Sequence, residues 1–131
     1  MCTVDKENTK CKGRKQMSIR KSVRKITVNV EENERRKFVL EYFVLEKETY
    51  VEGSPYNTYG IEVLKQERTE TGTMRIEYRK IFDVFCTEQE AYSACHLLAD
   101  NTVTPVSVHD VIEQLIGTDE IECEEYEIMA V

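Results

Sequence analysis

The chain has 131 residues, 40% of them hydrophobic, and a net charge of −7 at pH 7. This length provides one modest domain with a single core, and no apolar run approaches the roughly 18 residues of a membrane span. The composition therefore argues against a membrane protein. The five cysteines, an odd number without repeated spacing, favour a reducing compartment over a disulfide framework, so we expect a cytoplasmic protein.

The charges are distributed very unevenly along the chain. Residues 1–25 contain nine lysine or arginine residues and two acids, a net charge of +7, which leaves −14 for the remainder. Because this segment is mostly polar, it buries too little apolar surface to offset the entropy of ordering, and we predict a basic, disordered arm over residues 1–25. Residues 118–131 contain six acids and no base, which predicts an acidic tail after a single α+β domain at 26–117.

Alternating apolar residues predict four strands after the arm. They lie at about residues 26–30, 38–45, 59–63 and 74–78, and turns separate them at 31–36, 53–57 and 69–72. The run at 38–45 is apolar at all positions but one, and its aromatic and β-branched residues favour a covered strand over the alternative of a buried helix. After Lys80 the alternation is lost; a β-bulge near Arg79 and burial on both faces explain this equally well.

Two helices are predicted after the strands, because start signals precede two stretches with helical spacing. Thr87 and Glu90 form a capping box, and Ser107 with Asp110 forms a similar pair that predicts a second start. Pro105 lies between the two signals and makes one continuous helix unfavourable. The segment from Thr87 onward therefore predicts a helical hairpin.

Each predicted helix has one apolar face. In the first helix the residues that share this face are Ala91, Ala94, Cys95 and Leu98. In the second helix they are Val108, Val111, Ile112, Leu115 and Ile116, with His109, Asp110, Glu113 and Gln114 facing away. Gly117 follows where a C-terminal cap is expected.

The predicted elements combine into an α+β fold: an antiparallel four-stranded meander followed by a C-terminal pair of helices packed on one face. The acidic tail contains a few apolar residues that are compatible with a short edge strand, namely Ile121, Tyr126, Ile128 and Met129. Repulsion between the neighbouring acids favours a loose tail instead.

Three motifs of the chain resemble a known family. They are Leu40-Glu41-Tyr42-Phe43-Val44-Leu45-Glu46, Tyr59-Gly60-Ile61-Glu62-Val63, and the segment that runs from Val103-Thr104-Pro105 to Asp110-Val111-Ile112-Glu113. Over about residues 38–116 the chain is similar to a family of short uncharacterised proteins from anaerobic Gram-positive bacteria. That family has no activity to transfer. The resemblance implies a fold and a bacterial cytoplasm, and it assigns nothing to the basic arm or the acidic tail.

The sequence contains no recognisable catalytic, cofactor or metal constellation. Cys-x-x-Cys pairs and pairs of histidines at i, i+4 are absent, so we predict no metal and interpret Cys86 and Cys95 as buried apolar residues. His96 and His109 are interpreted as helix-surface residues. A thiol enzyme is the weakest alternative: Cys86 directly precedes a helix start, a position that activates thiols in some enzymes, but no base with an orienting partner accompanies it.

The basic arm is the feature that most resembles a functional site. Six residues in three adjacent pairs form the predicted polyanion-binding set, namely Arg14, Lys15, Arg20, Lys21, Arg24 and Lys25. These cations would neutralise phosphates without base specificity, because the arm lacks aromatic residues for stacking. The competing interpretation is an arm that is solvated or that folds back on the acidic surface of the same protein.

We therefore expect a small non-enzymatic protein-interaction or regulatory module, which meets an unknown protein partner or a second copy through its sheet or its helices. The alternative is a non-specific nucleic-acid binder that uses the basic arm, with the acidic tail as a competing polyanion. Neither function involves a membrane or a cofactor.

Overall fold

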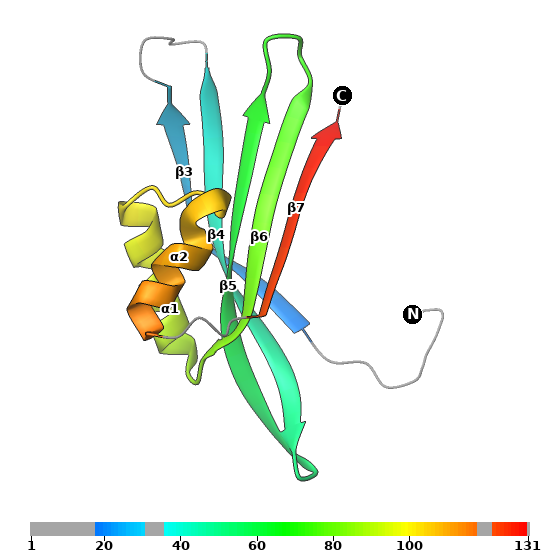
Figure 1. Ribbon diagram of the computed structural model, residues 1–131, viewed down its shortest axis with the longest axis vertical. Coiled ribbons are helices and arrows are strands. Elements are labelled where there is room, and N and C mark those ends of the chain that lie inside the picture. Colours follow the sequence, from blue (N-terminus) through cyan, green and yellow to red (C-terminus); the bar gives the residue numbers. More distant parts are fainter. Residues whose placement is uncertain (1–17, 31–35, 118–121, 131) are drawn as a thin grey trace, which may run out of the picture.

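The computed structural model describes residues 18–30, 36–117 and 122–130. Within these ranges, five antiparallel strands form one sheet in chain order, and two helices lie on one face of it (Figure 1). The strands are β3 (Ser18–Asn29), β4 (Lys37–Val51), β5 (Ser54–Arg68), β6 (Met74–Phe85) and β7 (Glu122–Ala130), and the helices are α1 (Glu88–Asp100) and α2 (Pro105–Ile116). The predicted α+β fold, a four-stranded antiparallel meander followed by two helices on one face, is confirmed.

Strand β3 begins inside the segment that was predicted to be a disordered arm. The prediction for residues 1–25 is wrong for residues 18–25, and residues 1–17 lie outside the described ranges. β3 pairs with β4 along its length, and Val23 and Ile26 pack partly buried against the core. Backbone pairing and this apolar burial offset the entropy of ordering. A register shift around Val23 interrupts the alternation, which explains why the pattern revealed the strand only from Ile26 onward.

Strand β7 lies in the segment that was predicted to be an acidic tail. The alternative of an edge strand is observed as β7, which pairs with β6, so the expectation of a loose tail is wrong for residues 122–130. In the register, Glu124 lies opposite Lys80 and Glu125 lies opposite Arg79.

β4 and β5 form a longer hairpin than predicted. Glu52 and Gly53 make the turn with positive φ values of 51° and 83°, as in the tight turns of β-hairpins, so the predicted turn over residues 53–57 is wrong beyond Gly53. The hairpin extends past the helices (Figure 1). Its end carries the exposed side chains of Tyr50, Val51 and Tyr56.

The apolar run at 38–45 is a strand in the sheet interior, so the buried-helix alternative is wrong. Leu40, Tyr42 and Val44 belong to the core cluster beneath the helices and are fully buried. Phe43 and Leu45 point to the opposite face because side chains alternate along a strand, and they are buried there as well. Burial on both faces explains the nearly continuous apolar composition.

A β-bulge near the end of β6 explains the loss of alternation in the sequence, although it lies a few residues beyond the predicted position. The pairs Tyr59–Phe85 and Ile61–Ile81 leave three residues of β6 opposite Gly60. The bulge and not an extended two-sided burial therefore changes the phase of the strand.

Gly60 is required by this bulge. A Cβ at Gly60 would lie 2.0 Å from the carbonyl oxygen of Ile81, far inside any allowed contact. On the bulge itself, Asp83 has a φ of 58°, and its carboxylate accepts a hydrogen bond from Thr58 Oγ1 and pairs with Lys47 Nζ at 3.4 Å. Close backbone packing and side-chain contacts with β4 and β5 therefore both fix the bulge.

The start of α1 is as predicted and the start of α2 is not. Thr87 is the N-cap of α1, and its Oγ1 accepts a hydrogen bond from the Glu90 backbone nitrogen at 3.2 Å, which confirms the predicted helix start. α2 begins at Pro105, so the predicted start at Ser107 is wrong. Proline suits this first position because a backbone N–H there has no acceptor within the helix, so proline loses no hydrogen bond by lacking it. Gly117 caps α2 with a φ of 73°, as predicted.

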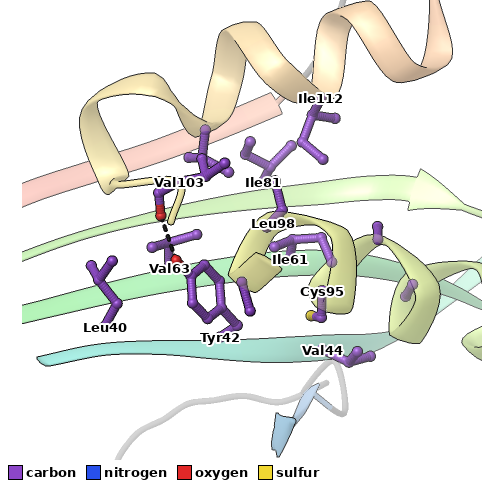
Figure 2. Packing of buried hydrophobic residues seen from close by; sticks show 14 residues of the cluster. Leu40, Tyr42, Val44, Ile61, Val63, Ile81, Cys95, Leu98, Val103 and Ile112 are labelled. Carbon is purple, nitrogen blue, oxygen red and sulfur yellow. Dashed lines mark hydrogen bonds between the residues drawn. The ribbon is translucent and has the colours of Figure 1, made fainter. Parts of the chain in front are cut away.

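The core lies between the sheet and the two helices (Figure 2). The sheet contributes Leu40, Tyr42, Val44, Ile61, Val63 and Ile81, and the helical segment contributes Ala91, Ala94, Cys95, Leu98, Ala99, Val103, Val108 and Ile112. In Figure 2 the Tyr42 hydroxyl points to the loop between the helices, where it donates a hydrogen bond to the Val103 carbonyl oxygen at 2.8 Å. This buried bond anchors the helical pair to β4.

The apolar face of α1 is confirmed, whereas the buried face of α2 is narrower than predicted. Val108 and Ile112 are fully buried, and Val111 and Ile116 pack partly buried against the core. Leu115 is 46% exposed, so its assignment to the buried face is wrong. α2 packs on β5 and β6, and Leu115 lies in the last turn of the helix, where its side chain is only partly covered.

The position of Ile112 in the core leads to a stability prediction. Replacing Ile112 by alanine is expected to lower the free energy of unfolding by about 3 kcal/mol, because a buried aliphatic truncation loses packing and leaves a cavity. Glu113→Ala on the outer face is the control, with an expected change below about 0.5 kcal/mol. Urea denaturation of both variants measures the difference; equal effects would mean that the buried face of α2 is assigned wrongly.

Candidate functional site

Four of the six predicted polyanion-binding residues lie on β3, and two lie outside the described residues. The four are Arg20, Lys21, Arg24 and Lys25, and the two are Arg14 and Lys15. Three of the four make ion pairs with carboxylates of the same chain. Their charges are therefore compensated within the protein, which favours the interpretation of a basic segment that meets the protein's own acidic groups.

Arg20 makes an ion pair with a buried acid. Its Nε lies 2.6 Å from Glu62 Oε1, and its Nη2 lies 3.2 Å from Glu62 Oε2. The guanidinium also lies over the Phe43 ring, 3.6 Å from the centroid. The Glu62 side chain is only 3% exposed, and its hydrogen bond raises the pKa of Arg20. Arg20 thus compensates a buried charge and covers an aromatic ring on the sheet face that the helices leave open.

Lys21 and Arg24 point to the other face and join β3 to α1. Lys21 Nζ lies 2.5 Å from Glu88 Oε2 in the first turn of α1, and Arg24 Nη1 lies 2.9 Å from Asp100 Oδ1 in its last turn. The two pairs hold both ends of the helix against the strand. These basic residues therefore position α1 on the sheet.

The structural role of Arg20 is testable by comparison with Lys25 on the same strand. Arg20→Ala is expected to lower the free energy of unfolding by about 3 kcal/mol, the lower end of the range for a buried ion pair that loses one partner, because Arg20 itself is half exposed. Lys25→Ala is expected to change it by less than about 0.5 kcal/mol. Thermal melts give both values; if Arg20→Ala melts like the wild type, its guanidinium is not needed by Glu62 and is free for a ligand.

The two described cysteines lie in different environments. Cys95 is fully buried in the core, as predicted, and burial raises the pKa of its thiol to about 12. Cys86 is exposed, so its prediction as a buried residue is wrong. It lies between the last residue of β6 and the N-cap of α1, where the chain passes over the surface. His96 contacts Arg24 at 3.5 Å, and His109 lies on α2.

His109, Asp110 and Glu113 come close together on α2. Their potential ligand atoms lie within 4.8 Å of one another, and His109 Nδ1 lies 3.8 Å from Glu113 Oε2. A search for paired histidines at this spacing misses such a mixed group. The Asp110 side chain is 82% exposed, and exposed acidic groups of this kind are common without a metal. The absence of a metal stays a prediction.

A groove between α1 and α2 was not predicted. We define the interhelical groove as two hollows that meet at Leu97 of α1 and Leu115 of α2. The first, of about 640 Å³, is lined by Val84, Phe85, Cys86, Thr87, Gln89, Glu90, Ser93, Ala94, Leu97, Leu115 and Ile116. The second, of about 650 Å³, is lined by Leu97, Asn101, Thr102, Val103, Ser107, Val111, Gln114 and Leu115.

The groove exists because the two helices rest mainly on different strands. α1 packs chiefly on β3, β4 and β5, whereas α2 packs on β5 and β6. Their outer sides therefore diverge above the core, and the two leucines there are only partly covered, with exposed fractions of 42% for Leu97 and 46% for Leu115. The signal in the sequence was Leu97, a large apolar residue directly outside the predicted buried face of its helix. Leu115 was misread because its spacing fits the core row of α2.

The interhelical groove is apolar along its centre and neutral or acidic at its margin. Glu90 lines the first hollow, and its Oε1 accepts a hydrogen bond from Thr87 Oγ1 at 3.1 Å. The second hollow is bordered by amide and hydroxyl groups. Neither histidine lines the hollow that contains Cys86, so no imidazole is placed there to activate the thiol. The apolar centre of the groove is able to hold an apolar side chain.

Comparison with known proteins identifies a family. Within the described residues, neither helix is long and apolar enough to cross a membrane. No curated protein and no solved structure matches the chain. The family of unknown function DUF6514 matches residues 21–118, which include most of β3, the other strands of the meander and both helices. The matched region thus begins earlier than the expected residue 38, and the chain belongs to the family of unknown function DUF6514.

Proposed function

We propose that this protein is a small non-enzymatic protein-interaction module that binds a segment of another protein in the interhelical groove. The observation that carries the proposal is the pair of partly exposed leucines, Leu97 and Leu115, which meet between two hollows. Apolar side chains gathered in a concave surface are typical of docking sites, and a groove between helices suits a segment that inserts apolar anchors.

We propose a regulatory role on the same grounds. A non-enzymatic module regulates a partner by binding it and thereby changing which other molecules that partner is able to bind. We propose the cytoplasm of an anaerobic Gram-positive bacterium as the setting, as the resemblance implies. The odd number of cysteines supports a reducing compartment.

The nucleic-acid alternative has less support. Arg20, Lys21 and Arg24 each face a carboxylate of the same chain, so a phosphate would have to displace that partner. Binding to polyanions would then lose these ion pairs in exchange for new ones, with little net gain.

The proposal is tested by capturing partners from host extract with three versions of the protein. The groove variant carries Leu97→Ser and Leu115→Ser, and the control carries Val51→Ser, which replaces an exposed apolar residue at the hairpin end. We expect a specific protein to be retained by the wild type and by the control, and to be reduced at least tenfold with the groove variant.

Two outcomes would overturn the proposal. In the first, the same proteins are retained in equal amounts by all three versions, so the groove is not the binding surface. In the second, the retained material is nucleic acid that is released by salt and is indifferent to the leucine substitutions, which would favour the polyanion alternative. Circular dichroism melts of the variants confirm that each is folded.

A further inference from the structure

We infer that the segment bound in the interhelical groove is a basic amphipathic helix; the inference rests on the proposed function and specifies its partner. The first argument is one of dimensions. α1 has 13 residues, which corresponds to a groove wall of about 20 Å, the length of a helix of three to four turns. Two hollows on either side of Leu97 and Leu115 accommodate apolar side chains from more than one turn of such a helix.

The second argument is the charge of the helical layer. From Glu88 to Ile116 the chain contains five acids and no lysine or arginine. Two of the acids, Glu88 and Asp100, are used by Lys21 and Arg24 on the side that faces β3. The remaining carboxylates of the two helices therefore have no lysine or arginine on the helices themselves to neutralise them.

Three carboxylates remain on the outer parts of the layer. Glu90 lies in the first hollow beside the neutral hydroxyl of Thr87. Asp110 and Glu113 lie on α2 with His109 as their neighbour, and neither lines a hollow of the groove, so they act on a bound segment from its edge. Among the described residues, no lysine or arginine pairs with any of the three. A partner with lysine or arginine beside its apolar face would supply the missing cations, whereas an acidic partner would be repelled.

The same charge argues against a second copy as the occupant. A symmetric contact through the groove would bring together two layers that each keep three carboxylates without a lysine or arginine partner among the described residues. Like charges facing one another across an interface oppose association. The occupant is therefore a different protein segment, with apolar anchors on one side and cations along the edges.

Two synthetic peptides test the inference with the full-length protein. Both have 14 residues, about four helical turns, and the same pattern of leucines, but one fills the polar positions with lysine and the other with glutamate. Fluorescence anisotropy at low salt is expected to show at least tenfold tighter binding of the lysine peptide. Added salt should reduce the difference.

Variants locate this binding in the groove. Leu97→Ser with Leu115→Ser should weaken the lysine peptide at least tenfold, and Val51→Ser should leave it unchanged. Glu90→Gln should weaken it several-fold while the helix start stays intact, because glutamine also serves in a capping box.

Each contrary result has a distinct meaning. Equal binding of both peptides that is lost in the groove variant would overturn the charge inference and leave the docking groove in place. Binding of the lysine peptide that ignores the leucine substitutions would be adsorption to the acidic surface and would also overturn the inference. So would the failure of both peptides to bind. The proposed function is decided separately by the capture of partners from host extract.

Discussion

Replacing Gly60 by alanine is expected to lower the free energy of unfolding by about 3 kcal/mol or more, the upper end of the range for overpacking. The added Cβ would lie 2.0 Å from the Ile81 carbonyl oxygen and 3.0 Å from the Cα of Phe82. Both are backbone atoms of β6, so no side chain is able to rotate away. Relief would require β5 and β6 to separate at the bulge, which breaks pairing in the middle of the sheet. Urea denaturation followed by circular dichroism measures the loss.

Gly72→Ala is the matched control for this experiment. Gly72 has a φ of 89°, and a Cβ there would meet no atom within 4 Å. The expected cost is only the conformational strain of a positive φ, about 1 kcal/mol. If the two variants unfold at the same urea concentration, the close approach of Gly60 to Ile81 is incorrect, and with it the position of the bulge.

Alkaline pH is expected to destabilise the protein strongly between about pH 9 and pH 12. Burial raises the pKa of the Cys95 thiol from its ordinary value of 9.0 to about 12 and raises the pKa of Tyr42 to about 12. Above pH 9 the unfolded chain therefore releases protons that the folded chain still holds, so the free energy of unfolding falls as pH rises. For Cys95 the full difference of three pH units corresponds to about 4 kcal/mol, reached only near pH 12.

A Cys95→Ala variant isolates the contribution of the thiol. It should be less stable than the wild type at pH 8, because it lacks a buried sulfur, but should lose less stability between pH 9 and pH 11. All other titrating groups are shared, so the difference between the two slopes belongs to Cys95. The measurement is urea denaturation under reducing conditions at several pH values. Identical slopes would show that the Cys95 thiol titrates like an exposed one.

The order and type of the elements were predictable where the pattern was local. The N-cap at Thr87, the glycine cap at Gly117 and the alternation in the strands depend on residues close together in the chain. The small residues of α1 likewise marked its buried face correctly. Neighbouring residues alone determine such features, so they can be predicted from the sequence.

The sequence does not distinguish the first half of β3 from an arm, or β7 from a loose tail, because the pairing of both depends on distant partners. β3 looks like a soluble arm until Glu62 and Glu88 are placed beside Arg20 and Lys21. β7 looks like a tail until its backbone is paired with β6. The composition of a segment gives its own charges, but it does not show which charged residues will lie beside it in the folded protein. Partial burial of a polar strand is therefore a property of the whole sheet.

The interhelical groove was missed for a related reason. Helical periodicity assigned Leu115 to the core, and that would be correct if α1 and α2 packed closely along their length. The helices diverge instead because they rest on different strands, and this divergence depends on the sheet beneath them. The burial of Cys86 was predicted wrongly for a similar reason. Cys86 lies between β6 and α1, and its exposure depends on how the chain turns from the strand to the helix.

The topology has a consequence for the order of folding. Strands β3, β4, β5 and β6 are joined by hairpins, so each pairing closes a short loop, whereas β7 reaches β6 only after both helices have been inserted between them. Loop closure costs more entropy as the intervening chain lengthens, unless that chain is already compact. The four-stranded meander and its helices therefore form first, and β7 docks last on a finished template. Kinetic measurements should find β7 absent from the rate-limiting nucleus, with substitutions there accelerating unfolding and leaving the refolding rate nearly unchanged.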